Sequence, residues 1–115
     1  MTWRKKRDKC DKIWARIIRS KGYCEKCGKP QMLQAAHLIS RRHLKTRHDL
    51  DNGICLCIRH HIFWGHKEPD EFVDFIRELR GKDIFEELRT RSREEGKIDW
   101  DKRLSDLEEI ESRIP

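Results

Sequence analysis

The chain has 115 residues, of which 36% are hydrophobic and 42% are charged, so a thin core must lie beneath a strongly ionic surface. Lys and Arg outnumber Asp and Glu by 27 to 21, and the net charge of +6 favours a polyanionic partner such as nucleic acid, although such an excess can also serve solubility alone. The composition excludes a membrane-spanning protein because no apolar run is long enough, and the basic segment 3–7 lacks the apolar stretch of a secretion signal. We therefore expect a single cytoplasmic domain over residues 1–115 with no membrane partner.

The first predicted element is an amphipathic helix over residues 8–20. Its apolar residues recur at intervals of three and four positions, as the buried stripe of a helix requires: Cys10, Ile13, Trp14, Ile17 and Ile18. Gly22 follows two residues later and can serve as the C-terminal cap.

A Cys-x-x-Cys pair comes next, at Cys24 and Cys27, and a second pair of the same spacing, Cys57 and His60, follows after a longer excursion. The chain has five cysteines, an odd number. In a reducing compartment, a Cys-x-x-Cys pair among them indicates a metal site more than a disulfide. Two such pairs supply the tetrahedral shell of sulfur and nitrogen that zinc prefers. We therefore predict a structural Zn²⁺ held by these four residues.

The fourth zinc ligand has alternatives on sequence grounds. His60 completes the spacing, but His61 is adjacent to it, and Cys55 would share a strand face with Cys57. Cys10 and Cys55 otherwise fall within apolar patterns and are expected to be buried thiols.

The middle of the chain predicts a strand, a second strand and a helix. The two strands, within residues 32–39 and at 53–57, form an antiparallel hairpin, and a short helix covers residues 58–66. The loop between the strands carries four basic residues that are candidates for phosphate contacts, although any one of them could instead be a solvated side chain: Arg41, Arg42, Lys45 and Arg47. The segment 23–66 is thus a small ββα core with a zinc knuckle.

Residues 69–114 predict further helices, so the expected fold class is α+β with helices flanking the ββα core. Pro69 suits the first turn of a helix that Gly81 ends, a second helix lies within 83–95, and the last begins near Trp100. The apolar stripes of the last two predicted helices are narrow. We expect them to pack on the core, and a dimer seam is the alternative.

Three motifs in the ββα segment resemble the signature of the HNH endonucleases, also called ββα-metal nucleases. They are Ala36-His37-Leu38-Ile39, Asp51-Asn52-Gly53 and the run from Leu56 to His61, with His37, Asn52 and His61 as the H, N and H of the signature. Their intervals of fifteen and nine residues match the family. The resemblance covers residues 24–66, and the flanking segments 13–22 and 69–81 are similar to a group of bacteriophage HNH proteins.

This resemblance implies a zinc-stapled nuclease that hydrolyses DNA phosphodiester bonds in phage recombination, replication or packaging, with a divalent ion such as Mg²⁺ or Mn²⁺. Hydrolysis needs a base for the attacking water and a cation for the phosphate. His37 suits the base because a free imidazole has a pKa near 6.5. His61 suits the ion, and Asn52 either orients His37, which we favour, or gives its amide oxygen to the metal.

Two positions depart from the family pattern. Ala36 stands where many HNH proteins carry an Asp or His ligand, and Gly65 stands where a further ligand often sits. We therefore expect His61 to hold the catalytic ion with help from His66 or Asn52, completed by water and the substrate phosphate.

Other functional classes are compatible with the same sequence. The main alternative is a zinc-finger DNA-binding module without cleavage activity, and a third is a factor that processes RNA or branched DNA. A nicking assay with added divalent metal separates the first two classes, and a panel of duplex, junction and single-stranded substrates separates the third.

Overall fold

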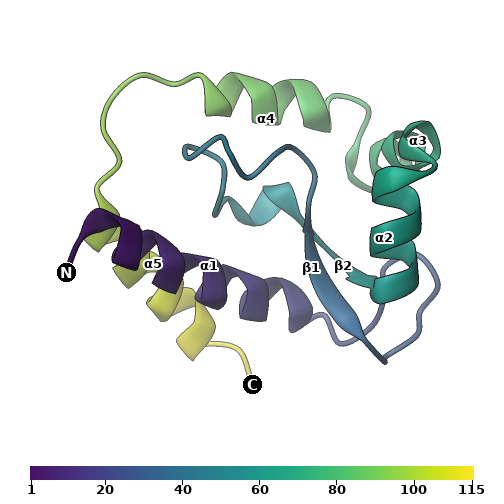
Figure 1. Ribbon diagram of the computed structural model, residues 1–115, viewed down its shortest axis with the longest axis horizontal. Helices are drawn as coiled ribbons and strands as arrows, with labels where there is room; N and C mark the ends of the chain where they lie inside the picture. Colours follow the sequence, from purple (N-terminus) through teal and green to yellow (C-terminus); the bar gives the residue numbers. More distant parts are fainter.

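The computed structural model describes the backbone of residues 1–115 and every side chain except those of residues 65 and 66. In chain order its elements are α1 (Trp3–Arg19), β1 (Leu33–His37), the short 3-10 helix η1 (Leu50–Asn52), β2 (Gly53–Cys57), α2 (Ile58–His66), α3 (Pro69–Arg80), α4 (Ile84–Ser92) and α5 (Trp100–Ser112). The predicted α+β class is confirmed, with a two-stranded antiparallel sheet among five helices (Figure 1).

The hairpin is the centre of the molecule, with α1 and α5 on one side of it and α2, α3 and α4 on the other (Figure 1). Leu33 pairs with Cys57 and His37 pairs with Gly53. Because successive strand residues point to opposite faces, Ile54 and Leu56 enter the core that α3 and α4 cover, whereas His37 lies on the face toward α1.

Helix α1 packs closely on the end of the hairpin at Gly53. A Cβ atom at Gly53 would lie 2.4 Å from Ile18 and 2.8 Å from Trp14, so only glycine fits there. Trp14 also donates its indole N–H to the carbonyl of Asp49 at 3.1 Å. The α1 helix is therefore fixed against the strand end that carries His37.

The N-terminal helix differs from the prediction at both ends. It begins at Trp3 instead of Asp8, because the Thr2 hydroxyl accepts from the Lys5 amide at 3.2 Å and caps the basic segment. It ends at Arg19, and Gly22 (φ 83°) lies in the turn beyond it. The strands, α2 and α3 begin and end within three residues of their predicted bounds.

The two narrow apolar stripes pack within the chain, as predicted. Ile84, Phe85 and Leu88 of α4 are buried in the main core, and Leu107 of α5 forms a second small core with residues of α1. An ion pair between Arg16 and Glu111 (2.6 Å) adds to the contact between α1 and α5. Among the described helices, none combines the length and apolar content needed to cross a membrane.

Candidate metal centre and active site

The Cys and His pairs meet in space. The ligand atoms of Cys24, Cys27, Cys57 and His60 all lie within 4.8 Å of one another. Individual separations include 3.9 Å between the sulfurs of Cys27 and Cys57 and 3.7 Å between the Cys24 sulfur and His60 Nδ1. In a tetrahedral zinc site with bonds of about 2.3 Å the ligand atoms lie about 3.8 Å apart. The donor set and its spacing thus fit a structural zinc ion.

A short turn builds the first half of this cluster. The Cys24 amide donates to the Lys29 carbonyl at 2.8 Å, and the Gly28 amide donates back to the Cys24 carbonyl at 2.7 Å. Gly28 has a φ of 80°, which favours glycine. The Glu25 carboxylate then accepts from the Cys55 amide at 2.8 Å, so the knuckle is attached directly to β2.

The pKa values of the cluster are shifted in different directions. Burial opposes ionisation of Cys24, but hydrogen bonds from the backbone amides of Cys57, Cys27 and Lys26 lower the pKa of its thiol. Burial and the adjacent thiols raise the pKa of Cys57, and burial lowers the pKa of the His60 imidazole. A bound cation would allow the neighbouring thiols to ionise together beside a neutral histidine.

The geometry separates the candidates for the fourth ligand. Among the described side chains His60 belongs to the group, with Nδ1 also 3.2 Å from the Cys57 sulfur, and Cys55 does not. Cys55 is fully buried. This burial, together with a smaller effect of the nearby Glu25 carboxylate, raises the pKa of the Cys55 thiol to about 11. Cys10 is likewise buried, as expected.

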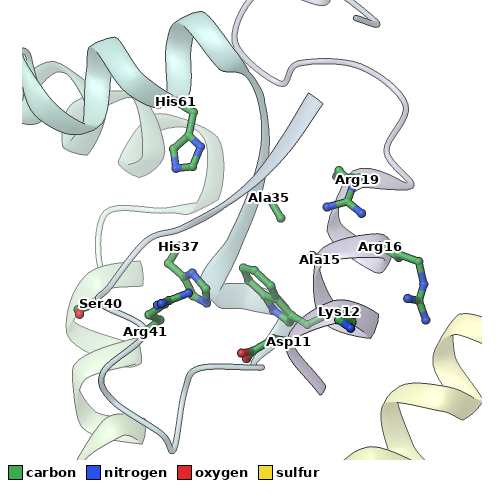
Figure 2. Close-up of a pocket in the computed structure, with 11 residues that line it drawn as sticks. Asp11, Lys12, Ala15, Arg16, Arg19, Ala35, His37, Ser40, Arg41 and His61 are labelled. Atoms are coloured by element: carbon green, nitrogen blue, oxygen red, sulfur yellow. The ribbon is translucent and has the colours of Figure 1, made fainter. Parts of the chain in front are cut away.

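A second constellation lies in a cleft of about 850 Å³ between α1, β1 and α2. His37 of β1 and His61 of α2 both line it, on the side opposite the α1 residues (Figure 2). The structure therefore brings the two histidines of the HNH motif to one cleft.

His37 is held in a defined orientation. Its Nε2 lies 2.9 Å from the Arg47 carbonyl oxygen, which can only accept, so Nε2 carries the proton and the neutral ring has its lone pair on Nδ1. The imidazole stacks on Trp14 with ring centroids 4.1 Å apart. Burial lowers the pKa of His37 below its ordinary value of 6.5. The ring is therefore neutral at physiological pH.

Asn52 closes the loop that holds His37. It is fully buried, and its Oδ1 accepts from the Ile39 amide at 2.8 Å while its Nδ2 donates to the Thr46 carbonyl at 3.0 Å. Thr46 directly precedes Arg47, whose carbonyl positions the His37 ring. These contacts tie both ends of the Asn52 amide to the loop backbone, as the predicted orienting role would require.

His61 has a partner that the sequence analysis missed. Its Nδ1 lies 2.6 Å from Oε1 of Gln34, and because an amide oxygen accepts, the ring carries a proton on Nδ1. An outer amide or carboxyl group of this kind fixes the tautomer of metal-binding histidines. A polar residue within the apolar run 32–39 was the available signal. The side chain of His66, the other expected contributor, lies outside the described residues.

The structure corrects the prediction that Arg47 contacts the phosphates of DNA. Its side chain is buried, and its Nε and Nη2 donate to the two carboxylate oxygens of Asp11 at 2.7 and 2.6 Å. Hydrogen bonds from His48 and Arg47 outweigh the burial of Asp11 and hold the pKa of that carboxyl well below its usual value. Arg47 thus joins the loop to α1 and is not available to phosphate. Arg41 and Arg42 are exposed, and Lys45 is half-buried.

Helix α1 contributes basic residues that the sequence analysis did not assign to the site. Lys12, Arg16 and Arg19 line the cleft opposite the histidines (Figure 2). Their spacing of four and three residues places them on one face of a helix, which was the available signal. The α1 wall of the cleft therefore carries Lys12 and Arg19 beside two ion-paired residues, Asp11 and Arg16, and Arg41 lies at its loop end.

Comparison with known families agrees with this geometry. The family model described as HNH endonuclease matches residues 22–68, the segment that contains both cysteine pairs, the hairpin and α2. Residues 22–68 of the chain are therefore similar to the HNH endonuclease family. Comparison with curated proteins and with solved structures gives no significant match.

Proposed function

We propose that the chain is a metal-dependent endonuclease that hydrolyses phosphodiester bonds of DNA in the cleft between α1 and α2. The observation that carries the proposal is that His37 and His61 line one cleft, each with one ring nitrogen bonded to an oxygen acceptor that fixes the orientation of the ring. The family implies a nuclease. The test is cleavage of plasmid DNA that depends on added divalent ion.

His37 is the proposed general base. Its Nδ1 lone pair accepts a proton from the attacking water, and the lowered pKa keeps this nitrogen unprotonated at pH 7. When the ring becomes positive, the hydrogen bond from Nε2 to the Arg47 carbonyl strengthens, and the nearby Asp11 carboxylate also favours the charged ring. Arg47, Asp11 and Asn52 are then positioning residues.

Two metal sites are proposed. Cys24, Cys27, Cys57 and His60 would hold a structural Zn²⁺, and His61 would hold the catalytic ion, with His66 retained as a predicted helper. A divalent ion bound there would neutralise charge on the phosphate and on the leaving 3′ oxygen. Gln34 keeps the His61 ring in the tautomer that binds a cation.

Loss of the Gln34 amide should weaken the catalytic ion site selectively. We expect Gln34→Ala to raise the divalent-ion concentration for half-maximal cleavage by about 10- to 100-fold, because outer-sphere partners of metal-binding histidines have effects of that size. His61→Ala should lose activation by the ion altogether. Both variants should keep their zinc when measured by elemental analysis. Release of zinc by His61→Ala would show that His60 and His61 have been assigned the wrong way round.

The cationic cleft walls should produce a salt-dependent affinity for DNA. Replacing Arg19 and Arg41 by Gln should lower the slope of log K against log salt by up to about 1.8, since each phosphate contact contributes about 0.9. The matched control is Lys102→Gln/Arg113→Gln, at the first turn and the C-cap of α5, which removes the same charge from exposed side chains outside the cleft. Fluorescence anisotropy at several salt concentrations measures both slopes. Equal slopes for the two variants would place the DNA elsewhere.

A DNA-binding module without cleavage activity is the second candidate. Ala36 favours it, because this residue is buried in the main core and supplies no ligand beside His37. Tight DNA binding without cleavage in any divalent metal would support this alternative, whereas preferential cleavage of RNA or DNA junctions would support the third. A phage origin, a role in recombination, replication or packaging, and a cytoplasmic location stay predictions from the sequence.

A further inference from the structure

A second groove lies on the other side of the loop from the cleft. It has a volume of about 490 Å³ and is bordered by residues 38–43, by α3 and by α4. Ser40 lines both this groove and the cleft, while Arg41 lines the cleft and Arg42 lines the groove. The two depressions are therefore neighbours that share one wall.

The groove is cationic without a balancing acid. Its basic side chains come from three separate segments of the chain: Arg42, His43, Arg77, Arg89 and Arg93. No Asp or Glu occurs among its lining residues in the part of the chain whose side chains are described. A further depression beside α5 shows the contrast, because there four Lys and Arg residues alternate with four carboxylates: Asp49, Glu94, Asp99 and Asp106.

Most of the guanidinium groups in the groove lack a protein carboxylate. Among the described side chains Arg42, Arg89 and Arg93 form no ion pair, and Arg77 reaches Glu86 only at 3.4 Å between exposed groups. The Arg77 Nε is buried without a hydrogen-bond partner among the described residues. The guanidinium groups of Arg77 and Arg89 both lie over the Phe85 ring, at 5.8 and 5.9 Å from its centroid. Two guanidinium groups thus lie over Phe85, and some of their N–H donors have no acceptor among the described residues.

We propose that this groove binds the phosphodiester backbone of the DNA that flanks the segment in the cleft. The planar guanidinium fork matches the oxygen geometry of phosphate, and three arginines without carboxylate partners can each take one. The shared wall at Ser40 allows one nucleic acid to occupy both depressions. The inference rests on the proposed nuclease function and adds to it a docking surface that extends beyond the HNH segment 22–68, since its α3 and α4 wall lies outside that segment.

Docking at a distance from the reacting phosphate has a defined kinetic consequence. Contacts to flanking DNA are made equally before and during cleavage, so their loss weakens binding without slowing the bound complex. We therefore expect a higher KM for DNA and an unchanged kcat. If the groove residues had only a structural role, their substitution would not change the salt dependence of binding while raising KM and leaving kcat unchanged.

The test uses Arg89→Gln/Arg93→Gln in the full chain with a duplex of about 20 base pairs, which at about 3.4 Å per pair exceeds the 38 Å length of the molecule. We expect roughly ten-fold weaker binding and a salt slope lower by up to about 1.8. At saturating DNA and divalent ion the cleavage rate should equal that of the wild type. Lys102→Gln/Arg113→Gln, with one substitution in the first turn of α5 and one at its C-cap, is the control for the change in net charge. Arg42→Gln/Arg93→Gln, which alters no residue within α4, should weaken binding and lower the salt slope in the same way.

The outcomes separate this inference from the nuclease proposal. A salt slope and affinity equal to those of the control variant would overturn the groove as a DNA site, whether or not the protein cuts. If the groove variant has a lower salt slope than the wild type but the wild type cleaves no DNA in any metal, the groove is supported and the nuclease proposal is overturned. A lower kcat with unchanged affinity would also overturn the docking role.

Discussion

Replacement of His37 by Ala should lower the rate of DNA cleavage by roughly 10²- to 10⁴-fold, which corresponds to about 3 to 5 kcal/mol of activation free energy. A group that takes a proton in the transition state contributes little to substrate binding. His37 is only half-buried and lies on the cleft side of the hairpin, so its truncation opens no void in the main core. Zinc content, the thermal transition and DNA affinity should therefore stay near the wild-type values.

The pH dependence of cleavage provides the internal control for this role. Burial lowers the pKa of His37 below 6.5, and the base is active only when unprotonated. The single-turnover rate should therefore rise with pH and then level off, with its midpoint below 6.5. His37→Ala should lack this step. A step of the same midpoint in the Ala variant would assign the titration to another group and remove His37 from the mechanism.

Removal of the structural zinc should unfold the protein. Structural zinc contributes on the order of 10 kcal/mol in small domains, which is comparable to the whole unfolding free energy of an ordinary domain. The cluster also joins two segments far apart in the sequence, namely the knuckle at residues 24–28 and the junction between β2 and α2. Far-UV circular dichroism should therefore show a large loss of cooperative structure after chelation, reversed by one equivalent of Zn²⁺.

Two cysteines of the same strand form a matched pair for this test. Cys57→Ala removes a member of the cluster, whereas Cys55→Ala removes a buried thiol outside it. We expect the first variant to lose zinc and its cooperative thermal transition. The second should keep one zinc per chain and lose only about 1 kcal/mol, as for a small truncation in a core. Equal zinc content in both folded variants would contradict the assignment.

The parts of the fold that depend on local pattern could be predicted from the sequence. The hairpin and α2 follow from two short apolar runs and the spacing of the cysteine pairs, and α3 follows from Pro69 and Gly81. The histidines of the site were found because their intervals match a family motif. The start of α1 was placed five residues late, because the prediction depended on apolar spacing and the first turns carry mainly charged residues capped by Thr2.

The contacts between distant segments could not be predicted in the same way. Arg47 looked like one more loop cation, and only the fold shows that Asp11, 36 residues away, lies against it. The pairing of Gln34 with His61 depends on how α2 crosses the hairpin. The basic wall of α1 likewise depends on its packing at Gly53, a contact between residues far apart in the chain.

The central claim is tested most directly by the conversion of supercoiled plasmid to open circle, with zinc-loaded wild-type protein and His37→Ala assayed in parallel. Mg²⁺ or Mn²⁺ is added or omitted without chelator, so that the structural zinc stays in place. We expect nicking by the wild type only when the ion is added, and nicking by His37→Ala that is at least about a hundred-fold slower. Binding of the plasmid without nicking in either metal, or equal rates for the two proteins, would contradict the proposed active site.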